Sequence, residues 1–213
     1  MKRFLLYALF LLAASPVSAQ LVMMKTDKTE KGWERVFYSA SAELAAQEFD
    51  RDWNLKRTRG RIPDGVVREY DASGRLIRIY NYKNNKREGE SKAYYENGKV
   101  KSIKNYKRDN LEGISRNFYS DGVLETERTY KKGKLDGLCR KYDGKGTLLF
   151  EYNYSGGEQD GITRQYTPEG VLIGEYNFKK GKLDGESKIY NSDGKLISVD
   201  TYSGGELVRK QAY

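Results

Sequence analysis

Six basic residues recur at one fixed position in a repeated stretch of this 213-residue chain. Cations spaced evenly along a surface could bind an anionic glycan, a lipid head group or an acidic face of another protein. They could instead pair with neighbouring carboxylates, for example Glu125, Glu127, Glu151 or Glu175, and keep the surface soluble. We favour this second interpretation. The six residues, called the basic column below, are Arg68, Lys92, Arg116, Arg140, Arg164 and Lys188.

The residue types that usually perform catalysis are scarce. The chain has no histidine and one cysteine, Cys139. This removes the commonest general base, the usual Ser and Cys triads and a thiolate zinc site. Cys139 cannot form an intrachain disulfide, and its position predicts a buried or half-buried, inert thiol. We therefore expect no enzyme activity, no cofactor and no metal site.

Carboxylates are plentiful, but the most regular ones precede a glycine in every copy of the repeat. A sixfold position predicts a turn role with hydrogen bonds to the backbone, whereas a carboxylate active site would need a unique pair. The pairs Gly156–Gly157 and Gly204–Gly205 lack the Lys-Ser/Thr of a phosphate loop and are predicted to be turn glycines. The six acidic residues are Asp64, Glu88, Glu112, Asp136, Asp160 and Asp184.

All these residues belong to a 24-residue unit that is repeated six times between residues 64 and 208. The first glycine of each copy is Gly65, Gly89, Gly113, Gly137, Gly161 or Gly185. A second glycine follows nine residues later, at Gly74, Gly98, Gly122, Gly146, Gly170 and Gly194. An aromatic residue stands five positions after the first glycine, at Tyr70, Tyr94, Phe118, Tyr142, Tyr166 and Tyr190.

The unit has the pattern of two strands and two turns. Its apolar and aromatic positions share parity within short runs rich in Tyr, Thr, Ile and Val, which is typical of strands. The second glycine follows polar residues and predicts a tight hairpin turn with positive φ. Frequent glycine and the absence of helical periodicity exclude a helical repeat. We expect about twelve strands in one elongated, twisted, antiparallel sheet of an all-β repeat protein.

This unit resembles the MORN repeat in its bacterial variant form. The segment 183–196, Leu-Asp-Gly-Glu-Ser-Lys-Ile-Tyr-Asn-Ser-Asp-Gly-Lys-Leu, shows the pattern nearly complete. Asn85 and Asp109 replace a loop glycine in the first two copies and are expected to tolerate the left-handed conformation. The resemblance implies stacked β-hairpins and a role in assembly or tethering. MORN repeats have also been linked to phospholipid binding, and some bacterial variants are described as antitoxins.

The remaining segments flank the array. Residues 1–19 have a basic start, an apolar run and a Val-Ser-Ala ending, which predicts an export signal cleaved after Ala19; an uncleaved anchor is the alternative. Residues 20–63 are expected to form a cap of partly helical or irregular structure that ends as a partial repeat, with helix-forming composition over 39–49. The alternative is a separate functional segment. Residues 64–208 are the array, and 209–213 form a basic tail.

The sequence thus predicts an exported, non-catalytic scaffold that binds another protein in the cell envelope or outside the cell. One alternative is a module that binds a membrane or cell-wall surface through the basic column, with an anionic lipid or glycan as partner. Another is an antitoxin-like or immunity-like protein, which fits poorly with an export signal. Nucleic acid is not expected as a partner, and no transmembrane span is expected in the mature chain.

Overall fold

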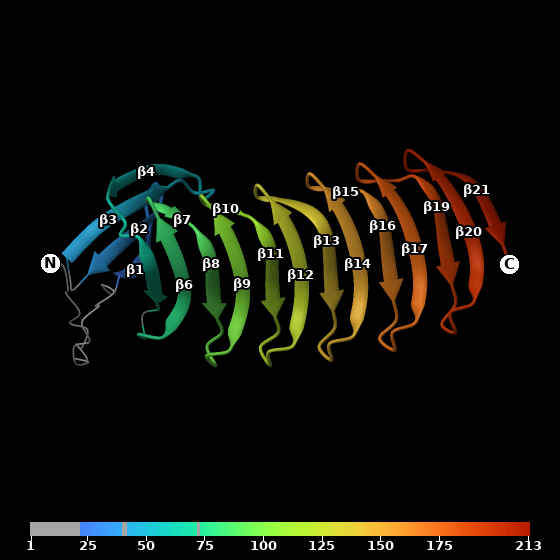
Figure 1. Cartoon of the computed structure of the whole chain (residues 1–213), viewed down its shortest axis with the longest axis horizontal. Coiled ribbons are helices and arrows are strands. Elements are labelled where there is room, and N and C mark those ends of the chain that lie inside the picture. The colour runs from blue at the N-terminus through green and yellow to red at the C-terminus, as the bar shows by residue number, and fades with distance from the viewer. Residues whose placement is uncertain (1–21, 40–41, 72) are drawn as a thin grey trace.

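The structure is a computed structural model that describes residues 22–39, 42–71 and 73–213. These residues form one elongated, open, twisted sheet, which runs from the N-terminal strands to β21 (Figure 1). The described residues contain strands and turns but no helix. The predicted all-β repeat fold is therefore confirmed. The predicted export signal at residues 1–19 lies outside the described residues.

Each repeat contributes one hairpin with two long strands, and short strands continue the ladder into the next copy. We number the copies 1 to 6 from Gly65, Gly89, Gly113, Gly137, Gly161 and Gly185. The strands of the array are β5 (Gly65–Tyr70), β6 (Leu76–Lys83), β7 (Lys86–Arg87), β8 (Gly89–Tyr94), β9 (Val100–Lys107), β10 (Asn110–Leu111), β11 (Gly113–Phe118), β12 (Leu124–Lys131), β13 (Lys134–Tyr142), β14 (Leu148–Ser155), β15 (Glu158–Gln159), β16 (Gly161–Tyr166), β17 (Leu172–Lys179), β18 (Lys182–Leu183), β19 (Gly185–Tyr190), β20 (Leu196–Ser203) and β21 (Glu206–Ala212).

Residues with positive φ form the turns, as the sequence predicts. Both glycine series lie in the left-handed half of φ space; Gly98, for example, has φ of 79°. The turns between copies need two such residues in succession, which is the geometry of a tight hairpin turn. Asn85 (φ 63°) and Asp109 (φ 70°) take this conformation where other copies have glycine. Gly156 and Gly157, with φ of 60° and 103°, occupy the same kind of turn, so their predicted role is confirmed.

The acidic residue before the first glycine connects two turns. In all six copies its carboxylate accepts a hydrogen bond from a backbone N–H twenty residues later, with distances from 2.8 to 3.2 Å. Asp136, for example, accepts from the N–H of Gly156. The acceptor therefore anchors the turn that closes the copy directly after it. This confirms the predicted backbone-binding role and explains why all six positions are acidic.

A second set of side chains joins neighbouring copies where their strands separate. Ladder pairing between copies 2 and 3 covers only Ile103 with Arg116 and Ser102 with Asn117. Beyond it, the Asn105 amide donates to the Ile114 carbonyl at 2.9 Å. The same contact recurs nine residues apart from Asn81, Thr129, Asn153 and Asn177 to the carbonyls of Glu90, Leu138, Ile162 and Glu186. These rungs satisfy carbonyls that the interrupted ladder leaves without a backbone donor.

The N-terminal cap is made of strands β1 (Val22–Thr29), β2 (Gly32–Ser39), β3 (Ala42–Phe49) and β4 (Leu55–Gly60). β1 pairs in parallel with β5, and antiparallel pairing continues through β2 and β3 to β4. The helix-forming composition over 39–49 was therefore misleading, because β3 lies there. Pairing with strands on both sides outweighs the weak helix propensity of Ala and Glu, and the small Ala45 and Ala46 are buried in the process.

The main apolar core lies between the cap and copy 1. Phe37, Ile62 and Val67 are fully buried, and they cluster with Met24, Ala45, Tyr80 and Tyr82. The Phe37 ring meets the Tyr82 ring edge-on, with centroids 5.4 Å apart. β2 is not a ladder neighbour of β6, so this contact shows that the cap folds over one face of the sheet. We call this face the cap-side face and the opposite one the ladder face.

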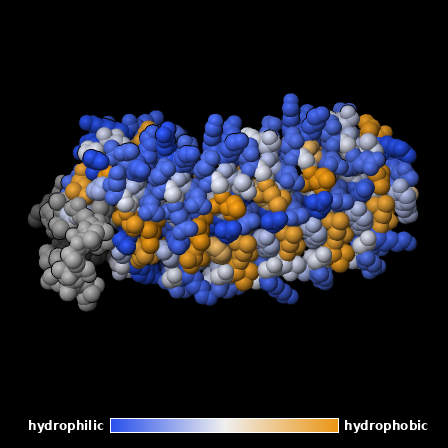
Figure 2. Space-filling model, in the orientation of Figure 1, coloured by the Kyte–Doolittle hydropathy of each residue, from blue (hydrophilic) through white to orange (hydrophobic). Residues whose placement is uncertain are grey.

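Beyond the cap the sheet has no second layer among the described residues. Figure 2 shows small hydrophobic spots that recur along the displayed face and are separated by hydrophilic residues. No helix within the described part of the chain is long and apolar enough to cross a membrane. The array therefore leaves much of both faces open to solvent, which makes these faces the candidate binding surfaces.

Candidate functional site

The structure places the central members of the predicted basic column on the ladder face, each opposite a glutamate. Arg116 on β11 pairs with Glu127 on β12, and Arg140 on β13 pairs with Glu151 on β14. Arg164 on β16 likewise lies opposite Glu175 on β17. The glutamate follows the first glycine of its copy by fourteen residues, and an acidic residue stands there only in copies 3, 4 and 5.

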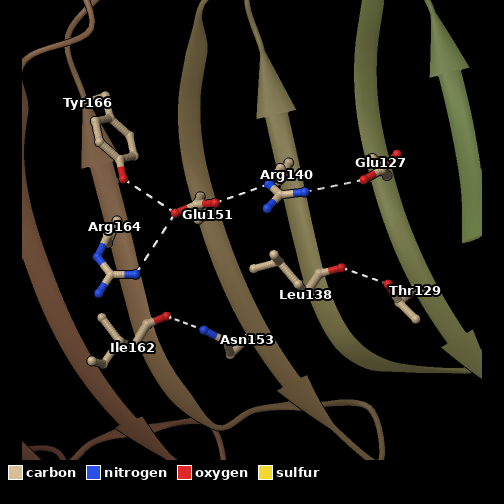
Figure 3. Close-up of polar contacts among 9 residues, drawn as sticks. All are labelled: Glu127, Thr129, Leu138, Arg140, Glu151, Asn153, Ile162, Arg164 and Tyr166. Carbon is tan, nitrogen blue, oxygen red and sulfur yellow. Dashed lines mark hydrogen bonds and ion pairs between the residues drawn. The ribbon is translucent and has the colours of Figure 1, made fainter.

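These side chains form a continuous row of ion pairs across six strands. Figure 3 shows the middle of this row, from Glu127 to Arg164. The Arg140 guanidinium lies 3.0 Å from the Glu151 carboxylate and 3.4 Å from that of Glu127. Glu151 is also reached by Arg164 at 3.9 Å and accepts a hydrogen bond from the Tyr166 hydroxyl at 3.3 Å. We call this row the Arg–Glu ladder.

The ladder alters the pKa of Arg140 and of the tyrosines beside it. The hydrogen bond to Glu151, acting with its charge, raises the pKa of Arg140 further above its usual value. Burial and the neighbouring Glu151 raise the pKa of Tyr166, so its hydroxyl stays a donor at neutral pH. Positive charge in the centre of the column is therefore neutralised by carboxylates, which is the favoured interpretation from sequence. Of the four suggested partners, Glu127, Glu151 and Glu175 form ion pairs and Glu125 forms none within the described residues.

The ends of the column differ from its centre. Copies 1, 2 and 6 have Ile79, Ile103 and Val199 in place of the glutamate. Lys92 pairs instead with Glu90 on its own strand, at 3.0 Å. Arg68 and Lys188 form no ion pair with any residue that the structure describes. The column is thus not a uniform cationic stripe but a neutral ladder with basic ends.

The cap-side face has a row of alternating small and large residues that the sequence prediction did not separate. Two residues after the first glycine stands a small or compact side chain that is at least nine-tenths buried in every copy: Val67, Ser91, Ser115, Cys139, Thr163 and Ser187. Between these positions the second strand of each copy places Tyr80, Lys104, Arg128, Tyr152, Tyr176 and Asp200. The sequence signal for this row is the position two residues after the first glycine of each copy. The residue type changes there from copy to copy, but the side chain stays small.

This alternation leaves hollows on the cap-side face. One, of about 220 Å³, is lined mainly by Thr126, Arg128, Cys139, Tyr152 and Tyr154. Cys139 lines this hollow. Burial raises the pKa of its thiol, so the thiol stays protonated and unreactive at neutral pH. The predicted buried thiol is therefore confirmed. Among the described residues no group of three His, Cys, Asp or Glu side chains could hold a metal ion.

The aromatic residue five positions after the first glycine ends the first strand of each copy and is half-buried throughout. In copies 5 and 6 its hydroxyl donates to the ladder glutamate of the preceding copy, from Tyr166 to Glu151 and from Tyr190 to Glu175. These residues therefore support the ladder as well as the strand ends.

Comparison with known families agrees with this architecture. The family model described as "MORN repeat variant" matches residues 63–84, 87–108, 111–132, 159–180 and 183–203. No match to this chain is found among the curated proteins. The matched segments correspond to copies 1, 2, 3, 5 and 6, and copy 4 between them shows the same strand pairing and bulge position. Matched repeats thus cover half of the chain, which belongs to the MORN repeat variant family.

Proposed function

We propose that this protein is an exported, non-catalytic scaffold that binds another protein in the cell envelope or outside the cell. MORN repeats are commonly protein-binding or membrane-binding scaffolds, and the family is generally non-enzymatic. Export is supported by the sequence pattern of residues 1–19.

The observation that carries the proposal is the contrast between the two faces of the array. On the ladder face, Arg116, Arg140 and Arg164 already have carboxylate partners. On the cap-side face, the half-buried rings of Tyr152 and Tyr176 lie opposite the buried small residues Cys139 and Thr163, and Tyr152 lines a hollow of about 220 Å³. Aromatic side chains bring large contact area at low entropic cost and are enriched at protein interfaces. The cap-side face is therefore the proposed binding surface.

The test is an affinity capture with the full-length protein produced in its own cell with a C-terminal tag, from detergent-solubilised envelope and from medium. Tyr152→Ser changes the cap-side face, and Ile114→Ser is the matched change of a part-exposed residue on the ladder face. We expect one enriched protein that is lost with Tyr152→Ser and kept with Ile114→Ser. The reverse pattern would move the interface to the ladder face.

Two further readouts decide between this proposal and its competitors. N-terminal sequencing of the purified protein is expected to begin at Gln20, and a full-length chain retained in the cytoplasm would contradict export. If no protein is enriched and the chain instead sediments with anionic vesicles in a salt-sensitive manner, membrane binding replaces protein binding.

A further inference from the structure

Two cations on the cap-side face lack the carboxylate partners that the ladder arginines have. Lys104 lies on β9 opposite Ser91, and Arg128 lies on β12 opposite Ser115. Neither forms an ion pair with any carboxylate in the described part of the chain, although both are partly buried. They occupy the same position in copies 2 and 3, so they stand about 10 Å apart, two strand spacings along the sheet.

Other cations surround them. Burial lowers the pKa of Lys104, and Arg87, Arg128 and Arg78 lower it further, so the protonated amine is repelled by three neighbours. Arg78 pairs with Glu69 at 2.8 Å and Arg87 with Asp109 at 3.0 Å. The carboxylates of Glu69 and Asp109 therefore neutralise Arg78 and Arg87, whereas Lys104 and Arg128 have no such carboxylate among the described residues. A site with partly desolvated, unpaired positive charge gains free energy from a bound anion.

The surface around these cations is recessed and partly apolar. A hollow of about 480 Å³ over copies 1 to 3 is lined by residues that include Arg78, Lys101, Lys104 and one carboxylate, Glu125, which forms no ion pair with any described residue. A second hollow, which Arg128 helps to line, lies over copies 3 and 4, and we call the two hollows together the recess. Along one side run the cross-strand pairs Tyr106 with Leu111 and Tyr130 with Leu135. The recess thus combines positive charge with apolar edges.

We propose that this recess binds an extended, acidic protein segment that crosses copies 2 to 4, with carboxylates on Lys104 and Arg128. This deepens the proposed function and rests on it, because it gives the chemistry of the partner. A polyproline II chain rises about 3.1 Å per residue with three residues per turn, so acidic side chains three residues apart lie on one side of it, about 9 Å apart, close to the spacing of the two cations. The tyrosine and leucine edges suit apolar side chains between the acidic ones.

The position of the cap favours a narrow chain over a flat membrane. Phe37 of the cap packs on Tyr82 of copy 1, so the cap rises above the cap-side face next to copy 2. Packed sheet layers lie about 10 Å apart, and a bilayer plane resting on this step would stay away from the recessed Lys104. A single extended segment can lie beside the step. An anionic glycan lacks the apolar side chains that the tyrosine and leucine pairs would contact.

The decisive experiment uses fluorescence anisotropy with the tagged full-length protein and defined probes. The main probe is a fluorescein-labelled peptide of repeated Glu-Pro-Leu, and its control is the corresponding Gln-Pro-Leu peptide. Heparin and vesicles that contain phosphatidylglycerol are the competing anions. The test variant is Lys104→Glu/Arg128→Glu. Its matched control is Lys107→Glu/Lys131→Glu, which makes the same charge change at exposed positions of the same two copies.

We expect the Glu peptide to bind in a salt-sensitive manner, the Gln peptide to bind at least about tenfold more weakly, and the test variant to lose at least about tenfold in affinity. The control variant should keep its affinity and its unfolding temperature, and the test variant should unfold at a temperature no lower than that of the parent. An equal loss of peptide affinity in both variants would show that binding depends only on net charge, and it would overturn the proposed site. Absence of peptide binding, with or without binding of heparin or vesicles, would overturn the ligand class.

The failure of this inference can be told apart from failure of the proposed function. If affinity capture gives a specific protein that Lys104→Glu/Arg128→Glu still binds, the scaffold function stands and the acidic-segment site is wrong. If no protein is captured at all, the proposed function fails first.

Discussion

The side-chain amide of Asn105 donates a hydrogen bond to the main-chain carbonyl of Ile114, one repeat further along the sheet. The two residues lie where the backbone ladder between copies 2 and 3 has ended. Thr129 makes the equivalent contact to Leu138 with its hydroxyl at 2.9 Å. Adjacent hairpins are therefore joined by a side chain that acts as one more rung of the ladder.

Removal of this rung should destabilise the array. We expect Asn105→Ala to lower the free energy of unfolding by about 1 kcal/mol, because it leaves the Ile114 carbonyl without its donor. Asn105→Thr should recover most of this loss, since Thr129 performs the role naturally. Urea unfolding followed by circular dichroism measures both. Equal stability of the Ala and Thr variants would show that the hydrogen bond contributes nothing.

The Arg–Glu ladder should contribute through Arg140, which lies between two carboxylates. Arg140→Ala leaves Glu127 and Glu151 facing each other across the gap, and we expect a loss of about 1 kcal/mol at low salt. Lys131→Ala, at an exposed position, should change stability by less than about 0.5 kcal/mol. Because salt screens the ladder, the difference between the two variants should shrink at high ionic strength. A loss that does not depend on salt would point to packing of the arginine stem.

Much of the array was predictable because its turns are local. The second residue of each turn between copies is Gly, Asn or Asp, so the turns at Asn85 and Gly157 followed from composition and period, whereas the first residue can be a Lys such as Lys132. The basic column was located correctly, but its neutralisation depended on cross-strand register, which a single sequence constrains only weakly. The small residues of the cap-side face include hydroxyl residues such as Ser115, a thiol at Cys139 and an aliphatic side chain at Val67, so their common burial was not recognised from residue type.

The cap was predicted less well because its structure depends on distant contacts. Ala45 and Ala46 favour a helix locally, yet they are buried between β2 and β4. The pairing of β1 with β5 joins segments more than forty residues apart and places a parallel pair between the cap and the array. No local pattern specifies such a pairing. The same limit applies to the unpaired state of Lys104, which is defined by the absence of a nearby carboxylate among the described residues.

The hairpin glycines should be required for backbone conformation rather than for space. Gly98 has φ of 79°, and a Cβ added there would have no heavy atom within 4 Å. We expect Gly98→Ala to cost about 1–2 kcal/mol from the left-handed conformation alone. Gly144, which also has open space but no positive φ, is the matched control, and Gly144→Ala should be neutral or slightly stabilising. Thermal unfolding measures both, and equal costs would contradict the φ argument.

Cys139 should be unreactive in the folded protein. Its side chain is 4% exposed, and burial raises the pKa of the thiol, so at neutral pH little thiolate is available to attack a reagent. We expect slow labelling by iodoacetamide that becomes fast in denaturant. Cys139→Ser should cost less than about 1 kcal/mol, because Ser91, Ser115 and Ser187 occupy the same position in other copies. Rapid labelling of the folded chain would show that the row opens in solution.

Lys104 should lower the free energy of unfolding of the protein, although it contributes to binding of an acidic segment. Its pKa is lowered in the folded state by burial and by Arg87, Arg128 and Arg78, so the folded protein binds this proton less tightly than the unfolded chain does. Protonation therefore destabilises the fold at neutral pH, and this cost fades as the pH rises toward the ordinary lysine pKa of 10.5. We expect Lys104→Met to unfold at a higher temperature than the parent at neutral pH, with a smaller difference at alkaline pH. The same variant should bind the Glu-Pro-Leu peptide more weakly. A variant that is both less stable and equally able to bind would show that Lys104 is a structural residue and not part of a site for acidic partners.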